Sequence, residues 1–286
     1  MRPKNLKTKI FLDGSDIQET KTILSLLGFL DGQTTNPSNF AKSPETVERV
    51  KRDGTFDLDA LYQAYKLRVQ QISKLLPDGS ISIEVYADKS TTAPEMLKQA
   101  REFNGWIPNA YIKFPITAEG LKAAEQAVEE GIRLNMTLCF SQPQAAAVYA
   151  ATKGAPVGGI FVSPFVGRWY DKGVAGMDLI KNILKMYEQG DGHVKVLTSS
   201  VRTSEQFQYA LALGTDIITA YFDAIKDWGT AGMPIPDVGT FDNSEYQPIP
   251  YEDLSLDRPC LDYKIGHKMT DAGLEKFVSD WNALIK

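Results

Sequence analysis

The sequence predicts an α/β protein of the (β/α)8 TIM barrel class, formed as a single domain over residues 1–286. Eight short apolar runs alternate with helical patterns along the chain, and such alternation is typical of parallel sheets. Eight strand–helix units are the number that closes a barrel, and barrels routinely run about 200–250 residues as one domain. A doubly wound open sheet is the alternative, but no G-x-G-x-x-G motif follows the first apolar run to support it.

The strands are expected where β-branched and aromatic residues gather in short runs between turn residues. The first run, KIFLD, is followed by GSD, in which Ser15 and Asp16 can cap a helix. The fourth run, AYIKF, is ended by Pro115, which cannot donate a backbone hydrogen bond to a sheet. The eight expected strands are 9–13, 32–36, 81–86, 110–114, 133–138, 159–163, 194–199 and 216–220.

The helices are expected where apolar residues recur with helical spacing between start and stop signals. Thr117 precedes one pattern that closes at Gly131, and Thr203 or Ser204 caps another that closes at Gly214. The seven expected helices between strands are 16–28, 56–76, 93–104, 118–131, 142–154, 176–190 and 204–214.

The last part of the chain departs from this alternation. Residues 229–265 are rich in Pro, Gly, Asp and Tyr and show no clear period. Long loops in compact domains are usually functional or disordered, and the many aromatic residues favour an ordered insertion at the surface. A C-terminal amphipathic helix is expected over 270–286, because Leu274, Phe277, Val278, Trp281 and Leu284 share one face.

Composition excludes several classes of function. The formal net charge is -5, so bulk charge favours neither a nucleic acid nor an anionic membrane as partner. The sequence contains no run of about 18 apolar residues, so no membrane span is predicted. The N-terminus lacks the apolar segment of a signal peptide. Cys139 and Cys260 form no metal motif or disulfide framework. We therefore expect a cytoplasmic protein.

With only two histidines, His193 and His267, a multi-histidine zinc site and a Ser-His-Asp triad are both disfavoured. Acid–base chemistry would then fall to carboxylates and lysine. In a barrel of this class the active site lies at the carboxyl ends of the strands. The polar residues expected at those ends are Asp13, Thr34, Thr35, Asn36, Glu84, Lys113, Asn135, Thr137, Ser163, Arg168, Ser199, Ser200 and Arg202.

Lys113 is the central candidate, because it interrupts the apolar run YIKFPIT. A buried unpaired charge is costly, and burial in an apolar barrel favours the neutral, nucleophilic amine. Such an amine can attack a ketose to form a Schiff base, whose iminium accepts electrons when a carbon–carbon bond breaks. Asp13 and Glu84 can serve as the base and the proton relay. A structural ion pair between Glu84 and Lys113 is the alternative explanation.

These residues lie in segments that resemble the transaldolases, especially their short-chain group. The resemblance covers nearly the whole chain, and TTNPS together with a lysine before x-Pro is its most specific part. The matching segments are FLDGSDIQE, LLGFLDGQTTNPS, ISIEVYAD, YIKFPITAEGLKAA, GIRLNMTLCFSQPQA, FVSPFVGRWYDKG, VLTSSVRT and MTDAGLEKFVSDWN.

The resemblance implies a Schiff base at Lys113, with Asp13 as general acid–base and Glu84 positioning a catalytic water together with Thr137. It implies transfer of a dihydroxyacetone unit from a ketose phosphate to an aldose phosphate, with no metal or organic cofactor. The substrate-binding residues that it implies are Thr35, Asn36, Asn135, Ser163 and Phe165, with Arg168, Ser200 and Arg202 at the phosphate.

Two related activities stay open as alternatives. The fructose 6-phosphate aldolases, which release free dihydroxyacetone, resemble this chain but typically carry Gln at the position of Glu84 and Tyr at that of Phe165. Both positions here favour transfer. A sulfonated ketose is the second alternative, since its tetrahedral anionic head could occupy the same arginine site.

The resemblance further implies a homo-oligomer, because the last helix of short members packs on a neighbouring subunit. The 229–265 insertion, which short members largely lack, could lie over the barrel mouth or an adjoining subunit. A non-catalytic sugar-phosphate sensor is the remaining hypothesis, and the intact Lys113, Asp13 and Glu84 argue against it.

Overall fold

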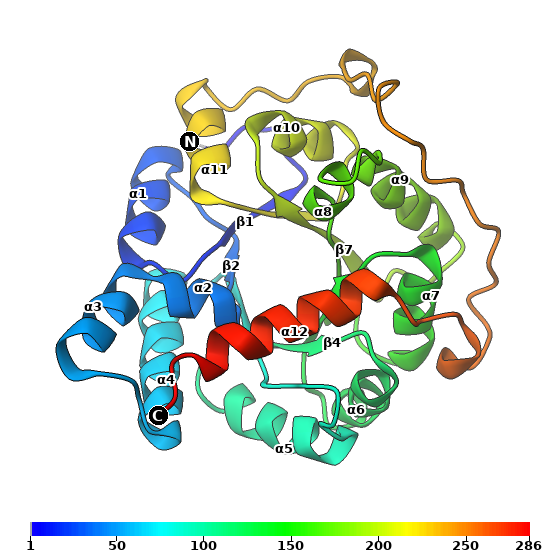
Figure 1. Ribbon diagram of the computed structural model, residues 1–286. Coiled ribbons are helices and arrows are strands. Elements are labelled where there is room, and N and C mark those ends of the chain that lie inside the picture. The colour runs from blue at the N-terminus through cyan, green and yellow to red at the C-terminus, as the bar shows by residue number, and fades with distance from the viewer. Residues whose placement is uncertain (1) are drawn as a thin grey trace.

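The computed structural model describes residues 2–286 and shows eight parallel strands that close into a barrel in chain order. Strand β1 pairs with both β2 and β8, and helices surround the barrel (Figure 1). This architecture confirms the predicted (β/α)8 barrel. The strands are β1 (Lys9–Asp13), β2 (Gly32–Thr34), β3 (Ser80–Glu84), β4 (Ala110–Pro115), β5 (Leu134–Cys139), β6 (Ile160–Pro164), β7 (Val194–Val201) and β8 (Ile217–Ala220).

The seven predicted helices between strands are all present, and their caps explain where they begin. Thr117 accepts a hydrogen bond from the Gly120 amide, and Thr203, rather than Ser204, caps its helix by accepting from Gln206. These side chains satisfy backbone donors that have no partner within the helix. The seven helices are α1 (Ile17–Leu27), α4 (Leu58–Leu75), α5 (Ala93–Asn104), α6 (Ala118–Glu129), α7 (Gln142–Ala151), α9 (Gly176–Tyr187) and α10 (Ser204–Ala212).

Sequence analysis missed four further helices: α2 (Pro37–Lys42), α3 (Pro44–Asp53), α8 (Gly167–Tyr170) and α11 (Phe222–Thr230). Pro37 stands at the first position of α2, where its missing N–H costs no helical hydrogen bond. The Asn36 side chain caps α2 by accepting from the Asn39 amide. This cap places α2 directly at the carboxyl end of β2, where it can reach the barrel mouth.

The interior of the barrel consists of an apolar layer below a polar one. Phe11, Tyr111, Phe161, Leu197 and Ile217 form a separate buried cluster, within which the rings of Tyr111 and Phe161 stack 4.1 Å apart. Because every second side chain of a strand points inward, the residue two positions further along lies one layer nearer the mouth. Those residues are Asp13, Lys113, Ser163, Ser199 and Thr219.

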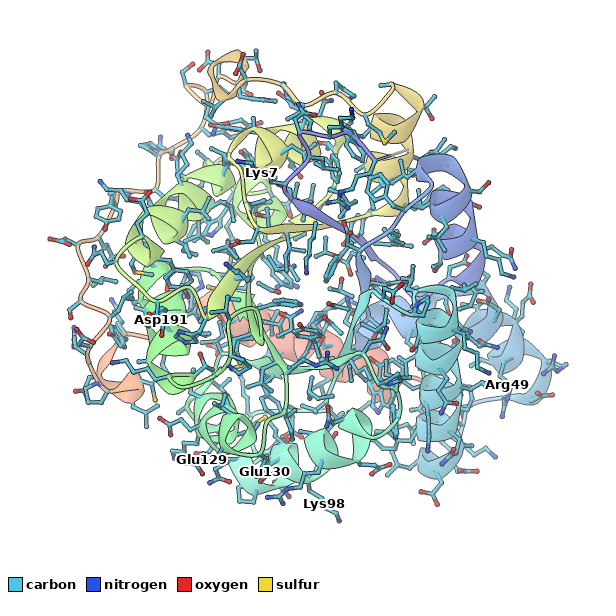
Figure 2. All side chains as sticks on the ribbon, turned by 180° about the vertical axis from the view of Figure 1, so that it is seen from behind. Lys7, Arg49, Lys98, Glu129, Glu130 and Asp191 are labelled. Carbon is cyan, nitrogen blue, oxygen red and sulfur yellow. The ribbon has the colours of Figure 1, made fainter. Side chains whose placement is uncertain are left out.

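Gly32 makes room for this packing at the start of β2. A Cβ atom at this position would lie 2.3 Å from the carbonyl oxygen of Ser80 and 2.7 Å from the ring of Phe11. Viewed from the end opposite the mouth, side chains fill the barrel, and the labelled Glu129 and Glu130 project outward (Figure 2). The apolar layer therefore closes this end, so the barrel is accessible at the carboxyl ends of its strands.

Residues 231–267, which we call the strap, follow α11 and include the short turns η1 (Val238–Thr240) and η2 (Cys260–Asp262). The strap runs outside α10, α9 and α7 (Figure 1). The Asn182 side chain of α9 donates to the carbonyl of Ile249, and the Gln142 side chain of α7 donates to that of Glu252. The strap thus follows the outer helices, not the mouth, and carries the chain back to the barrel.

Helix α12 (Lys268–Asn282) lies across the barrel mouth (Figure 1). It begins two residues before the expected start at 270 and ends before the expected 286. Gly273 allows a close approach, since a Cβ there would lie 2.6 Å from the Leu138 side chain and 3.0 Å from Nη1 of Arg168. Among residues 2–286, no helix combines the length and apolar character needed to cross a membrane.

Candidate active site

A central cavity of about 180 Å³ opens at the carboxyl ends of the strands, beneath α12. Ten of the twelve residues that sequence analysis assigned to the site line it together; Glu84 and Thr35 do not. These ten come from six different strands or the turns after them, as expected for a barrel of this class. They are Asp13, Asn36, Lys113, Asn135, Thr137, Ser163, Phe165, Arg168, Ser200 and Arg202.

Lys113 is buried at the base of this cavity and is ion-paired. Its Nζ lies 2.7 Å from Oε2 of Glu84 and donates to the backbone carbonyl of Thr35 at 3.0 Å. Glu84 and Asn135 are its neighbours in register on β3 and β5. The parallel register therefore brings an amine, a carboxylate and an amide side by side at one level of the barrel.

Glu84 is 5 % exposed. Burial raises the pKa of its carboxyl above the ordinary value, whereas the charge of Lys113 opposes this rise and that of Asp13 adds to it. A carboxylate whose pKa is raised accepts a proton more readily than an exposed one. The pair could therefore serve either as a structural ion pair or as an amine with an adjacent proton acceptor.

Asp13 is held by two donors at the edge of the cavity. Its Oδ1 accepts hydrogen bonds from Oγ1 of Thr34 at 3.1 Å and from Nδ2 of Asn39 at 2.7 Å. Thr34 gives its only proton to Asp13, so the 2.6 Å contact between Thr34 and Thr219 must have Thr219 as donor. Both bonds to the carboxyl use Oδ1, which leaves Oδ2 for a ligand hydroxyl.

The pKa of Asp13 is also raised by burial. The positive charge of Lys113 and the hydrogen bonds from Thr34 and Asn39 act in the opposite direction. Removal of any of these three would therefore raise the pKa further. The side chains around Asp13 thus set how readily it takes a proton.

Asn135 is oriented by two serine hydroxyls. Its Nδ2 donates to Oγ of Ser82 at 3.0 Å, and its Oδ1 accepts from Oγ of Ser163 at 2.6 Å. Thr137, two residues further along β5, lines the cavity with a fully buried Oγ1 that has no hydrogen-bond partner among the described residues. Such a hydroxyl favours a polar ligand or water at this level.

Thr35 lies behind the cavity wall. Its hydroxyl donates to the carbonyl of Ser82 at 2.8 Å and lies 2.6 Å from the Tyr65 hydroxyl. Because a threonine has one hydroxyl proton, Tyr65 is the donor of the second bond. The side chain of Thr35 is therefore fully used within the protein, and its backbone carbonyl, which contacts Lys113, is its link to the site.

Two arginines lie at the far side of the cavity from β2, with different surroundings. Nη1 of Arg202 contacts both carboxylate oxygens of Asp171, at 2.8 and 2.7 Å. Arg168 has no carboxylate partner among residues 2–286; it donates to the carbonyl of Met269 at 3.3 Å and lies over the rings of Phe140 and Phe165. Burial and the nearby Arg202 lower the pKa of Arg168. Arg168 thus offers an uncompensated charge to an anion.

Ser200 and Gly167 shape the space between these arginines. Ser200 has a φ of 58°, a left-handed conformation that is uncommon for residues other than glycine. A Cβ atom on Gly167 would lie 2.4 Å from the Ser200 carbonyl oxygen and 2.8 Å from Nε of Arg202. The absence of a side chain at Gly167 therefore allows Ser200 and Arg202 to occupy their positions.

Several residues that line the cavity had no role in the site predicted from sequence. Asn39 and Ser38 belong to α2, a helix that sequence analysis missed, and Thr219 lies in β8, whose other residues are apolar. Phe277 was predicted only as a packing residue of the last helix, and no sequence signal places that helix over the mouth. Thr34 and Ser199, which were expected at strand ends but given no role, also line the cavity. The residues that the structure adds are Ser38, Asn39, Lys42, Thr219, Tyr221, Lys276 and Phe277.

The site thus combines a buried amine beside a carboxylate, a second carboxyl group near it, and an anion-binding edge formed by arginines. This combination suits covalent catalysis on a carbonyl compound with a charged end. Within residues 2–286, no group of three or more His, Cys, Asp or Glu side chains is arranged to hold a metal ion.

Comparisons with known proteins show what the chain is similar to. Residues 10–286 match the model of a family described as "Transaldolase/Fructose-6-phosphate aldolase". A "Probable transaldolase" of Dehalococcoides mccartyi is 36% identical over 278 residues, which cover 97% of this chain and 100% of that protein. A "Probable transaldolase" of a Roseiflexus species is 34% identical over 275 residues, covering 96% of this chain and 97% of the relative.

Proposed function

Because the chain belongs to the transaldolase/fructose-6-phosphate aldolase family, we propose that it transfers a dihydroxyacetone unit from a ketose phosphate to an aldose phosphate through a Schiff base on Lys113. Membership of this family makes the chain a transferase of the class I aldolase type. The donor would be fructose 6-phosphate or sedoheptulose 7-phosphate. The observation that carries the proposal is the buried Lys113–Glu84 pair at the base of a cavity edged by arginines.

Lys113 would act first as the nucleophile. Its amine adds to the C2 carbonyl of the ketose, and the resulting carbinolamine loses water to give an iminium. Glu84, 2.7 Å from Nζ, can accept the proton that the amine must lose before attack and can return it to the departing hydroxyl. Thr137 would hold the water at this step with its unpartnered hydroxyl.

Asp13 would then act as general base for carbon–carbon cleavage. Its Oδ2 takes the proton of the C4 hydroxyl, the C3–C4 bond breaks, and the bonding electrons move into the iminium to give an enamine. The aldehyde leaves, an acceptor aldehyde takes its place, and C3 attacks it while Asp13 returns the proton to the new hydroxyl. This role requires Asp13 to be ionised first, so activity should rise with pH through its pKa.

The two ends of the sugar would be held by different groups. Asn36, Asn135 and Ser163 present amide and hydroxyl groups for the hydroxyls of the three-carbon unit. Arg168, Arg202 and Ser200 present donors suited to a tetrahedral anion, and arginine binds phosphate oxygens with a geometry that lysine lacks. Their presence with Lys113 in the same cavity supports a substrate that contacts both.

Transfer is favoured over release of free dihydroxyacetone by Phe165, which lines the cavity without a hydroxyl that could orient water. The alternative is an enzyme similar to fructose 6-phosphate aldolase, which would give dihydroxyacetone without an acceptor. The cytoplasmic location and the homo-oligomer implied by the family resemblance stay predictions, and sedimentation of the purified protein tests the oligomer.

The test is borohydride reduction of the protein mixed with fructose 6-phosphate, followed by intact-mass and peptide mass spectrometry. A reduced three-carbon adduct on Lys113, absent from Lys113→Met, would support both the Schiff base and the cleavage. An adduct on another lysine would overturn the assignment. No adduct with fructose 6-phosphate, but one with a sulfonated ketose, would keep the lysine chemistry and change the donor.

A further inference from the structure

A second, small cavity of about 10 Å³ lies behind Glu84, between the ends of β3 and β4 and the helix α12. This is about the volume that a single water molecule needs. Glu84 lines this small cavity, whereas Lys113 lines the central one. Since Oε2 of Glu84 and Nζ of Lys113 are 2.7 Å apart, the ion pair forms the boundary between the two cavities.

Helix α12 closes the small cavity with three apolar side chains. Phe277 lines both the small cavity and the central one. Leu274 and Val278 line the small cavity and also an outer groove that they share with Asp88 and Ser90. A single layer of side chains at helical spacing i, i+3 and i+4 therefore separates Glu84 from the surface. We call Leu274, Phe277 and Val278 the apolar seal.

The reaction needs water on the Glu84 side of Lys113. This step rests on the proposed function: the enamine left after cleavage first takes onto C3 the proton that Asp13 holds, which gives an iminium. The iminium carbon accepts a water oxygen and the water loses a proton to Glu84. The C–N bond then breaks as this proton and the hydroxyl proton of the carbinolamine pass to the nitrogen. The products are the free ketone and the protonated amine of Lys113, so atoms and charge balance. In the proposed function, Thr137, which lines the central cavity, holds one water there. A ketose that spans Lys113 and the arginines fills the rest of that cavity, so further water reaches Glu84 from the small cavity.

We propose that the apolar seal limits the access of water to Glu84, and thereby determines whether the enzyme-bound three-carbon unit is transferred or hydrolysed. A tight seal leaves the bound unit time to meet an acceptor aldehyde. An open seal brings water from the outer groove to Glu84 and releases dihydroxyacetone. The seal residues are specificity-determining residues that do not touch the reacting atoms.

The fold holds the seal in place from both ends of α12. Near its start, Arg168 donates to the carbonyl of Met269. Near its end, Asp280 accepts a hydrogen bond from Ser38 at the start of α2. Gly273, between them, lets the helix approach the Leu138 side chain. The side chains that seal the small cavity are thus fixed relative to Glu84.

The experiment measures decay of the Schiff base when no acceptor is present. The protein is loaded with fructose 6-phosphate, passed rapidly through a desalting column, and sampled over time by borohydride trapping and mass spectrometry. Val278→Ala and Leu274→Ala shorten the seal and should each speed the loss of the Lys113 adduct several-fold. The ratio of dihydroxyacetone released to transfer product should rise by the same factor at steady state.

Leu284→Ala is the matched control, because it truncates a buried side chain just after α12, away from the residues that line the small cavity. It should leave the decay rate and the product ratio unchanged. Ala87→Leu acts in the opposite direction, since Ala87 lines the small cavity and a larger side chain would fill it. This variant should slow adduct decay relative to wild type.

Three results would overturn the inference. Decay rates that do not change in Val278→Ala and Leu274→Ala, with circular dichroism showing folded protein, would exclude a seal. An equal change in Leu284→Ala would mean a general loosening of the helix. Absence of any adduct in the wild type, with fructose 6-phosphate and with a sulfonated ketose, would overturn the proposed function itself and the seal with it, so the two failures are distinguishable.

Discussion

Glu84 and Lys113 face each other across neighbouring strands, with Oε2 and Nζ 2.7 Å apart and both side chains buried. A buried ion pair adds little net stability, because desolvation offsets the attraction, but removal of one partner leaves an uncompensated charge. Stability alone therefore does not explain the pair, and this supports a chemical role for the amine. This relationship gives the first prediction, which separates the stability of the pair from its catalytic role.

Lys113→Met should abolish Schiff-base formation and lower the free energy of unfolding by about 3–5 kcal/mol at pH 8, because Glu84 would be buried without a cation. The double variant Lys113→Met/Glu84→Gln should recover part of this loss while staying inactive. Urea denaturation of the wild type and of these two variants measures the difference in unfolding free energy. Lys122→Met removes an exposed partner of Glu119 and should cost only about 0–1 kcal/mol. A double variant less stable than Lys113→Met would contradict the assignment.

Asn39→Ala should move the acidic limb of the pH–rate profile to higher pH. Asn39 donates to Asp13 at 2.7 Å, and this bond lowers the pKa of a carboxyl whose burial raises it. Loss of the bond raises the pKa further, so a higher pH is needed to ionise the general base. Steady-state rates between pH 5 and pH 9 measure the shift.

Thr34→Val removes the other donor to the same oxygen and should shift the acidic limb in the same direction, with the largest shift in the double variant. Asn104→Ala, at the end of α5 and outside the cavity lining, should leave the profile unchanged. An acidic limb that moves to lower pH in either variant would exclude Asp13 as the base.

The strands and most helices could be predicted from sequence because their patterns are local. Lys113 is recognised because it interrupts the apolar run YIKFPIT, and Thr117 marks the start of the helix that follows. The position of α12 could not be predicted, since it depends on contacts far apart in the chain, such as Arg168 with Met269. The cavity behind Glu84 depends on that placement and was missed for the same reason.

The site was predicted where a strand end carries a polar residue and missed where a short helix or a distant element supplies it. Asn135 and Ser163 follow the inward alternation of their strands, and the structure brings their side chains into contact at 2.6 Å. Thr35 has the same polar character, but it lies behind the cavity wall, bonded to Tyr65 and Ser82. Sequence alone does not distinguish a hydroxyl that faces a ligand from one used by the protein.

Glu19→Gln should stabilise the protein at neutral and alkaline pH. Burial, together with the charges of Asp16, Asp223 and Glu45, raises the pKa of Glu19 from 4.5 to about 7. The folded state therefore binds a proton more tightly than the unfolded state between these values, so Glu19 makes stability fall as pH rises through this window.

The measurement is the difference in unfolding free energy between Glu19→Gln and wild type across pH 4 to pH 8. The difference should be near zero at pH 4 and should grow in favour of the variant until about pH 7. Its size should be modest, because Glu19 is only half-buried and solvent screens its charge. Glu129→Gln, at an exposed position on α6, is the control and should show no such trend. A variant less stable than wild type at pH 8 would contradict the expected sign.

Gly167→Ala should weaken binding of the anionic end of the sugar without altering the chemistry at Lys113. The added Cβ would lie 2.4 Å from the Ser200 carbonyl oxygen and 2.8 Å from Nε of Arg202, so one or both must move. We expect the KM for fructose 6-phosphate to rise about tenfold, which corresponds to roughly 1.4 kcal/mol.

Gly239→Ala is the matched control, because a Cβ there meets nothing within 4 Å. Dihydroxyacetone lacks the anionic group, so trapping of its Schiff base by borohydride should proceed equally in both variants and in wild type. A loss of trapping in Gly167→Ala alone would show that the substitution disturbs Lys113 and that the anion site is not separable from it.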